Sequence, residues 1–260
     1  TNFDTANVTG AANFTVTGNL SVDGGTIKLD GNYPVGNYNV ALGDTALDNG
    51  SFSGANNVAV GNASMSATTS GNFNASVGAF SLKLNTTGSS NTAFGSGSLE
   101  NNTTGSSNVG LGTSALVSNT TASDNTAVGA SALAANTTGT RNVGVGKQAL
   151  LVATTGNDNV AVGFVAADSL TTASNTTAIG SWALAGNTTG ANNTGIGYRA
   201  LYLNTTASNN TAVGHGAVYS NTTGAGNTGI GGEAGLSLTT SSYNTALGFR
   251  ALKLTTTASN

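Results

Sequence analysis

The sequence predicts an all-β protein, a parallel β-solenoid of thirteen 17-residue coils that covers residues 39–260. Three observations predict this fold: a glycine recurs at fixed spacing, small and apolar residues keep fixed positions relative to it, and charged residues avoid those positions. After a first step of 18 residues, every spacing between these repeat glycines is 17 residues. The repeat glycines are Gly43, Gly61, Gly78, Gly95, Gly112, Gly129, Gly146, Gly163, Gly180, Gly197, Gly214, Gly231 and Gly248. Such internal repeats are typical of architectures in which each unit stacks on its neighbours.

Positions counted from the repeat glycine differ sharply in the residues they accept. The fourth residue before it is Asn in every unit except at Thr176, and the second before it is Ala, Gly or Ser. The residue directly before it is apolar, the third after it is Ala or Ser, and the fourth after it is usually Leu. All thirteen charged side chains of the repeats lie one, two, five or twelve residues after it. Because burying an unpaired charge is costly, these positions should face water and the fixed positions a packed interior.

Each coil is predicted to contain short strands and tight turns. The triplet before the glycine, such as Thr126–Val128, favours a strand whose outer side chains point one way and whose middle side chain points the other. The recurring Asn-Thr-Thr-Gly phrase suits a turn, since Asn and Gly tolerate positive φ. A helix is disfavoured by the abundance of Gly, Asn and Thr. We therefore expect one strand–turn–strand–turn circuit per coil, with coils stacked about 4.8 Å apart.

The fixed apolar positions define a predicted structural core. Its residues are Val60, Val77, Phe94, Leu111, Val128, Val145, Val162, Ile179, Ile196, Val213, Ile230, Leu247, Leu116, Leu133, Leu150, Leu184 and Leu201. We also expect the asparagine column to stack as a ladder of side-chain amides. The predicted ladder comprises Asn57, Asn74, Asn91, Asn108, Asn125, Asn142 and Asn159. One coil offers few large apolar side chains to offset the entropy of ordering it, so we expect an obligate oligomer, with three parallel chains favoured.

Several repeat segments resemble the head repeats of trimeric autotransporter adhesins. These segments are NVALG (39–43), NVAVG (57–61 and 159–163) and TTAIG (176–180). The resemblance extends over about 220 residues and implies a left-handed parallel β-roll in which three chains wind around one axis. The repeat is longer than is usual in that family, and neither a coiled-coil stalk nor a membrane-anchor barrel follows it.

Residues 1–38 are predicted to be a separate N-terminal β-strand cap or lead-in segment. Apolar residues alternate within 14–22, and Asp23–Gly25 suits a tight turn. The stretch VTGNLSVDGGTIKLDG (16–31) is similar to lead-in segments of structural and tail-fibre proteins from phages of marine bacteria. At the other end, Asn260 completes a unit without a visible cap. We therefore expect a longer protein, or ends that stack on another component.

The sequence offers no support for catalysis, cofactors or metal binding. The only histidine, His215, lies in a water-facing position, and the ten acidic residues are scattered along the chain. Cysteine is absent, no Asp column suggests a calcium β-roll, and the Gly-x-Gly strings lack a following helix. We expect no enzyme. A net charge of −3 without a basic block disfavours nucleic acid, and the lack of a run of 18 apolar residues disfavours membrane insertion.

Two further interpretations concern the threonine pairs. Asn136, Asn187, Asn204 and Asn221 begin Asn-Thr-Thr phrases that match glycosylation acceptors, although turn chemistry already explains those letters. Threonines aligned in rows along successive coils could also match an ice lattice and so suggest ice binding. Adjacent residues of a strand point to opposite faces, so each pair would offer only one threonine per side.

Outward-facing aromatic residues are the candidates for surface recognition. They are Trp182, Tyr198, Tyr202 and Tyr219, together with the neighbouring Arg199. Aromatic rings beside polar groups suit sugar or protein recognition. The alternative is that they shield the edges of the rod or fill gaps between protomers.

The sequence thus indicates a structural fibre protein. We expect a phage tail fibre or virion appendage that serves as a stiff spacer and host-adhesion element. The alternative is a bacterial cell-surface trimeric adhesin or an extracellular filament subunit. The expected partners are further copies of the chain, other fibre or baseplate components, and a host receptor or glycan.

Overall fold

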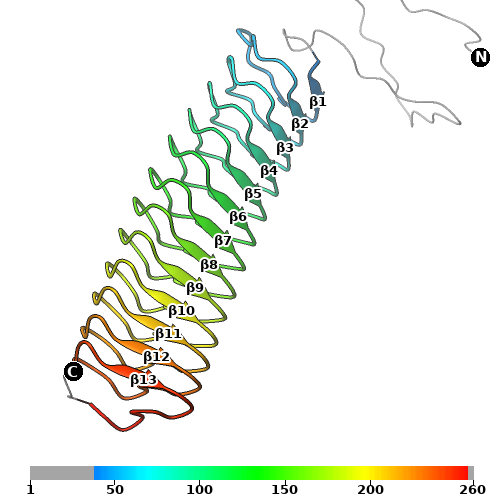
Figure 1. Cartoon of the computed structure of the whole chain (residues 1–260). Coiled ribbons are helices and arrows are strands. Elements are labelled where there is room, and N and C mark those ends of the chain that lie inside the picture. Colours follow the sequence, from blue (N-terminus) through cyan, green and yellow to red (C-terminus); the bar gives the residue numbers. More distant parts are fainter. Residues whose placement is uncertain (1–37, 257–260) are drawn as a thin grey trace, which may run out of the picture. The chain divides into compact units, whose positions relative to one another are not determined.

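The computed structural model describes residues 38–256, which form the expected parallel β-solenoid (Figure 1). The predicted N-terminal segment lies outside the described residues, except for Tyr38. The strands are β1 Val40–Leu42, β2 Val58–Val60, β3 Ala75–Val77, β4 Thr92–Phe94, β5 Val109–Leu111, β6 Thr126–Val128, β7 Val143–Val145, β8 Val160–Val162, β9 Thr177–Ile179, β10 Thr194–Ile196, β11 Thr211–Val213, β12 Thr228–Ile230 and β13 Thr245–Leu247. They form one sheet in the order β1 to β13. Within this range each coil has one strand, not two, and there is no helix.

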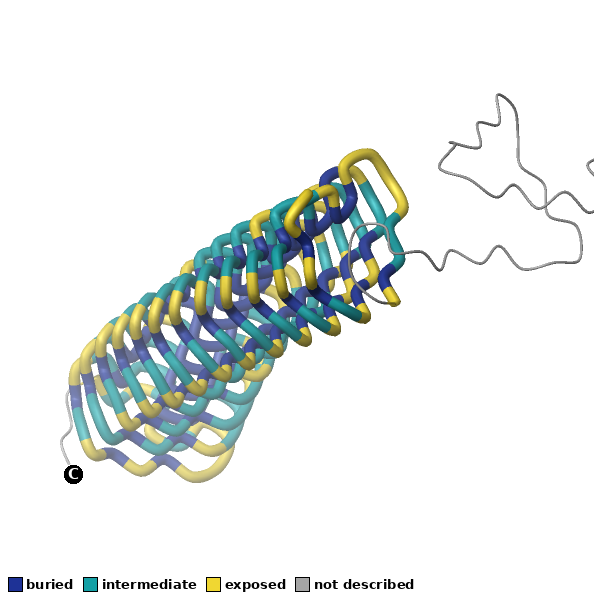
Figure 2. The backbone as a smooth tube through the Cα atoms, turned by 90° about the horizontal axis from the view of Figure 1, so that it is seen from above, coloured by how far each residue is buried: buried dark blue, intermediate teal, exposed yellow. Residues whose placement is uncertain are grey.

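Parallel pairing in register converts the columns of the sequence into rows along the molecule. Val143 and Val145 of β7 lie opposite Val160 and Val162 of β8, and the same repeat positions pair between all consecutive strands. Figure 2 shows the result as stripes of buried, intermediate and exposed positions that run along the stacked coils. The repeat therefore determines the surface as well as the interior.

The repeat glycine is required where each strand turns away from the sheet. Gly129 has a φ of +131°, a conformation that L side chains rarely adopt. A Cβ atom there would lie 2.6 Å from the carbonyl carbon and oxygen of Gly146 in the next coil. Consecutive turns thus stack backbone against backbone, which leaves no room for a side chain.

The interior is narrow and combines leucines with small residues. Leu116, Leu133, Leu150, Leu184 and Leu201 are completely buried, so these members of the predicted core lie inside the solenoid. The middle residue of each strand also faces inward, and a Cβ atom at Gly144 would lie 3.3 Å from Cγ of Leu133. Leucines from one turn thus pack against the small middle residues of the strands.

The structure corrects the other twelve members of the predicted core. The residue before each repeat glycine is an outer member of its strand, so it points away from the interior that the middle residue faces. Its exposed fraction reaches 59% at Phe94 and 74% at Leu247. These half-buried or exposed residues, named here the strand-face row, are Val60, Val77, Phe94, Leu111, Val128, Val145, Val162, Ile179, Ile196, Val213, Ile230 and Leu247. They do not belong to the core of the single chain.

The asparagine column forms the expected ladder. Asn142 is fully buried, and its backbone N–H donates to Oδ1 of Asn125 at 2.9 Å. Its Nδ2 donates to the carbonyl of Gly156 at 2.8 Å, while Nδ2 of Asn159 donates to its Oδ1 at 3.0 Å. The contacts from Asn57 to Asn159 repeat this backbone-to-Oδ1 bond coil by coil. The ladder therefore satisfies polar groups that burial would otherwise leave unpaired.

A second asparagine ladder was not predicted from the sequence. It uses the Asn of the Asn-Thr-Thr phrase, seven residues after the repeat glycine. Its members are Asn85, Asn102, Asn119 and Asn136, and then Asn187, Asn204 and Asn221. In the following pair of threonines, Thr137 is half-buried and its Oγ1 donates to the carbonyl of Thr154 at 3.1 Å, whereas Thr138 is exposed. The phrase is thus a corner of the coil with one asparagine pointing inward.

Candidate functional site

The residues that vary most between coils share one surface, which we name the variable face. It consists of the positions one, two, five and six residues after each repeat glycine. In the coil after β5 these positions include Thr113, Ser114 and Val117, and in the next coil they include Ala130 and Ser131. Small side chains therefore suffice for the fold at these positions.

Between β8 and β12 the variable face carries a continuous group of aromatic rings, named here the aromatic strip. Its members are Phe164, Trp182, Tyr198, Tyr202, His215 and Tyr219. Trp182 contacts Phe164 and Tyr202 edge to face, at centroid distances of 5.7 and 6.1 Å. Tyr202 stacks on Tyr219 at 5.2 Å. Tyr198 and His215 form a second stack at 5.5 Å, so rings from four successive coils make one surface.

Arg199 joins the two stacks. Its guanidinium carbon lies 5.1 Å from the ring centroid of Tyr198 and 5.3 Å from that of Tyr202, within the range of cation–π attraction. Its Nε is buried and has no hydrogen-bond partner among the described residues. The strip thus contains a positive charge whose buried Nε–H is unpaired.

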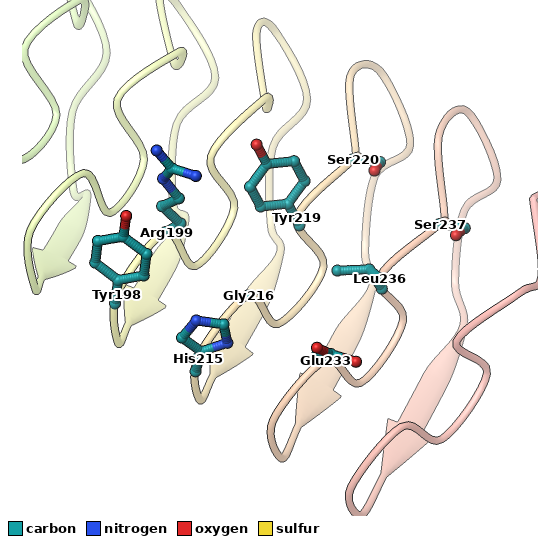
Figure 3. Close-up of a pocket in the computed structure, with 9 residues that line it drawn as sticks. All are labelled: Tyr198, Arg199, His215, Gly216, Tyr219, Ser220, Glu233, Leu236 and Ser237. Atoms are coloured by element: carbon teal, nitrogen blue, oxygen red, sulfur yellow. The ribbon is translucent and has the colours of Figure 1, made fainter.

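A pocket of about 320 Å³ opens at one end of the strip. Figure 3 shows His215, Gly216 and Tyr219 on one coil and Glu233 and Leu236 on the next. Gly216 lies two positions after its repeat glycine. The absence of a side chain at this position leaves the hollow between the two coils.

The fold itself does not require glycine at position 216. Its φ of +60° is close to the +55° of Arg199 and the +56° of Glu233, which occupy the same position in the adjacent coils. A Cβ atom on Gly216 would meet only Cδ1 of Leu236, at an ordinary 3.7 Å. The pocket is therefore a local feature that the backbone of the coil does not impose.

The wall of this pocket contains one carboxylate, that of Glu233, and one guanidinium, that of Arg199. Glu233 accepts hydrogen bonds from Nε of Arg250 at 2.8 Å and from Nζ of Lys253 at 2.6 Å. These bonds, led by that from Lys253, hold the pKa of the Glu233 carboxyl below its ordinary value. Among the described residues, Arg199 lines the pocket without an ion pair, whereas Glu233 is paired with Arg250 and Lys253.

A smaller pocket of about 190 Å³ lies at the other end of the strip. It is lined by Trp182, Tyr202, Asp168 and Gly186, among others. Burial raises the pKa of the Asp168 carboxyl above its ordinary value. This end of the strip is therefore acidic, in contrast to the end at Gly216.

All five recognition candidates from the sequence come together in the structure. Trp182, Tyr202 and Tyr219 belong to one chain of ring contacts, and Arg199 links it to Tyr198. Sequence reasoning missed His215 as part of the site and missed Gly216 altogether. The 17-residue period would have placed His215 beside Tyr198, because both directly follow a repeat glycine.

The fold and this surface define the class: the chain is a β-solenoid repeat protein. Comparisons with protein-family models, with curated proteins and with solved structures find no match for it. Across residues 38–256, no helix has the length and apolar character needed to cross a bilayer. The same residues contain no group of three or more His, Asp or Glu side chains arranged to hold a metal ion.

Proposed function

We propose that the protein is a stiff structural segment of a virion fibre, such as a tail fibre, which acts as a spacer and contributes to host attachment. The observation that carries this proposal is the uninterrupted sheet from β1 to β13, in which each coil is hydrogen-bonded to the next. Twelve steps of roughly 4.8 Å between thirteen strands correspond to a rod of roughly 58 Å. Such a rod resists bending because bending would strain hydrogen bonds in every coil.

The fibre is proposed to be a homotrimer assembled through the sheet. The strand-face row places an apolar side chain at the surface of every coil, and contiguous exposed apolar surface is typical of interaction sites. A row of this kind along one side of a rod suits association with identical rods in parallel. Further fibre or baseplate components would bind at the ends.

The second candidate function is a bacterial cell-surface adhesin or an extracellular filament subunit. The resemblance of the repeat to adhesin heads favours this candidate. In this function, too, the rod would serve as a stiff spacer. Antibodies raised against the solenoid would distinguish the two in electron micrographs. Labelling of virions supports the first candidate, and labelling of cell surfaces supports the second.

Sedimentation equilibrium of the full chain tests the assembly. We expect a species of three times the chain mass for the wild type and for Lys147→Asp, because Lys147 is exposed on the variable face. Val145→Asp places a charge within the strand-face row and is expected to leave a folded monomer. A wild type that remains monomeric at micromolar concentration, or a Val145→Asp variant that remains trimeric, contradicts the proposal.

A further inference from the structure

The aromatic strip is an addition that the solenoid does not need for folding. The coils that follow β5 and β6 complete the same turns with only Ser, Thr, Ala or Val at these positions. Exposed aromatic rings increase the apolar surface in contact with water, and Tyr198 retains an exposed fraction of 43%. Rings with both an apolar face and a polar edge are typical of recognition surfaces. The strip therefore has the character of a binding surface.

The pocket beside Gly216 gives this surface a defined place for a ligand. Its volume of about 320 Å³ is at the lower end of the range for small-molecule pockets, so it suits a compact ligand of one ring. His215 and Tyr219 supply aromatic walls, and Leu236 supplies an aliphatic wall. The hydroxyl groups of Ser220 and Ser237 also line it.

Charge narrows the ligand class further. Arg199 and Glu233 are the charged residues that line the pocket, and Glu233 is paired with Arg250 and Lys253, which do not line it. Since Glu233 is already bonded to two cations, Arg199 is left to pair with an external anion. Guanidinium groups bind carboxylates well because their donors match the two oxygens.

We propose that the pocket beside Gly216 binds an acidic sugar, namely a pyranose ring with a carboxylate, as part of a host glycan. The C–H face of the sugar lies against the rings of Tyr219 and His215, and its carboxylate pairs with Arg199. Its hydroxyl groups hydrogen-bond to Ser220 and Ser237. This inference supplies a ligand for the attachment role proposed above, on which its biological meaning rests. All residues of the pocket come from one chain, so binding itself does not require the trimer.

Calorimetric titration of the full chain with matched sugars tests the proposal. Glucuronate and glucose differ only in the carboxylate, as do galacturonate and galactose, and inorganic phosphate serves as a simple anion. We expect at least one uronate to bind at least about tenfold more tightly than its neutral partner and than phosphate. Absence of uronate binding, equal binding of the neutral sugar, or equal binding of phosphate would overturn the proposal.

Substitutions at one repeat position provide matched controls. Gly216→Gln fills the pocket with a residue that the fold already accepts there, since Gln148 has a φ of +60° at the same position. We expect it to weaken uronate binding at least about tenfold. Ser131→Gln makes the corresponding change on a coil without the strip and should leave binding unchanged. Arg199→Gln should abolish the preference for uronate over the neutral sugar.

Unchanged uronate affinity in Gly216→Gln would refute the assignment of the pocket. Circular dichroism and sedimentation of each variant report folding and assembly separately. If a variant loses sugar binding but still forms trimers, the substitution affects the pocket and not the assembly. A monomeric wild type that binds uronate refutes the proposed assembly and leaves the pocket intact.

Discussion

Asn136 donates a hydrogen bond of 2.9 Å from its side-chain nitrogen to the side-chain oxygen of Asn119, one coil earlier. Asn119 bonds to Asn102 in the same way, at 2.8 Å. The second asparagine ladder is interrupted there, because Ala153 occupies the next place, and it resumes at Asn187. The side-chain oxygen of Asn136 is consequently buried without a partner among the described residues. An unpaired buried acceptor of this kind costs stability.

Ala153→Asn is expected to extend the ladder and stabilise the protein. The new side-chain nitrogen would donate to Oδ1 of Asn136 and to the carbonyl of Gly156, as Asn136 itself donates to Gly139 at 3.0 Å. We expect a gain of about 1 kcal/mol in the free energy of unfolding, measured by urea denaturation. Ala153→Asp has the same shape without the N–H donors and should destabilise. A loss of stability in Ala153→Asn would show that the corner lacks room for the amide.

The stacked glycine turns predict a strong dependence on position along the rod. Gly129→Ala forces its Cβ against the carbonyl of Gly146 at 2.6 Å, so we expect a loss of about 3 kcal/mol or more. Gly248 has a similar backbone conformation, with a φ of +112°, but no described atom would lie within 4 Å of its Cβ. Gly248→Ala should therefore cost only the backbone strain. Equal losses from thermal unfolding of the two variants would mean that φ alone, and not coil stacking, requires the glycine.

The period of the sequence was sufficient to predict the solenoid, its thirteen coils and one strand in each coil. It also predicted a second strand per coil that the structure does not contain, and it could not assign every column to a side. Val145 and Leu133 belong to columns that are equally regular and apolar. Only the structure reveals an interior so narrow that leucines and the small middle residues fill it. Likewise, Asn142 and Asn136 each belong to an asparagine ladder, but only the ladder of Asn142 was predicted. Asn136 begins an Asn-Thr-Thr phrase, and its asparagine was already explained as a turn residue.

The sequence was sufficient to predict most of the aromatic strip but not the pocket beside Gly216. Trp182 and Tyr202 are twenty residues apart, and a 17-residue coil brings them within contact. The pocket, in contrast, arises from a missing side chain. In a chain with 38 glycines, nothing in the sequence distinguishes Gly216 as the one that opens a cavity.

The corrected core predicts two different responses to truncation. Leu133 is completely buried within one chain, so Leu133→Ala should cost about 2–5 kcal/mol at any protein concentration. Val145 lies in the strand-face row, so Val145→Ala should act mainly through assembly, with an effect that depends on protein concentration. Urea denaturation at two concentrations a hundredfold apart separates the two cases. A large, concentration-independent loss for Val145→Ala would place that side chain inside the single chain.

The two carboxylates at opposite ends of the aromatic strip predict opposite pH dependences. Burial raises the pKa of Asp168, so its contribution to stability is present below its ordinary value of 3.8 and is lost as the pH rises through the raised value. Asp168→Asn should therefore be more stable than the wild type at pH 7 and nearly equal to it at pH 3.

Hydrogen bonds from Lys253 and Arg250 lower the pKa of Glu233, so its contribution to stability is present above its ordinary pKa of 4.5 and is lost as the pH falls. Glu233→Gln should accordingly be less stable than the wild type at pH 7, with a difference that shrinks in acid. Thermal unfolding from pH 3 to pH 7 checks both, and parallel profiles for the two variants would contradict the assigned environments.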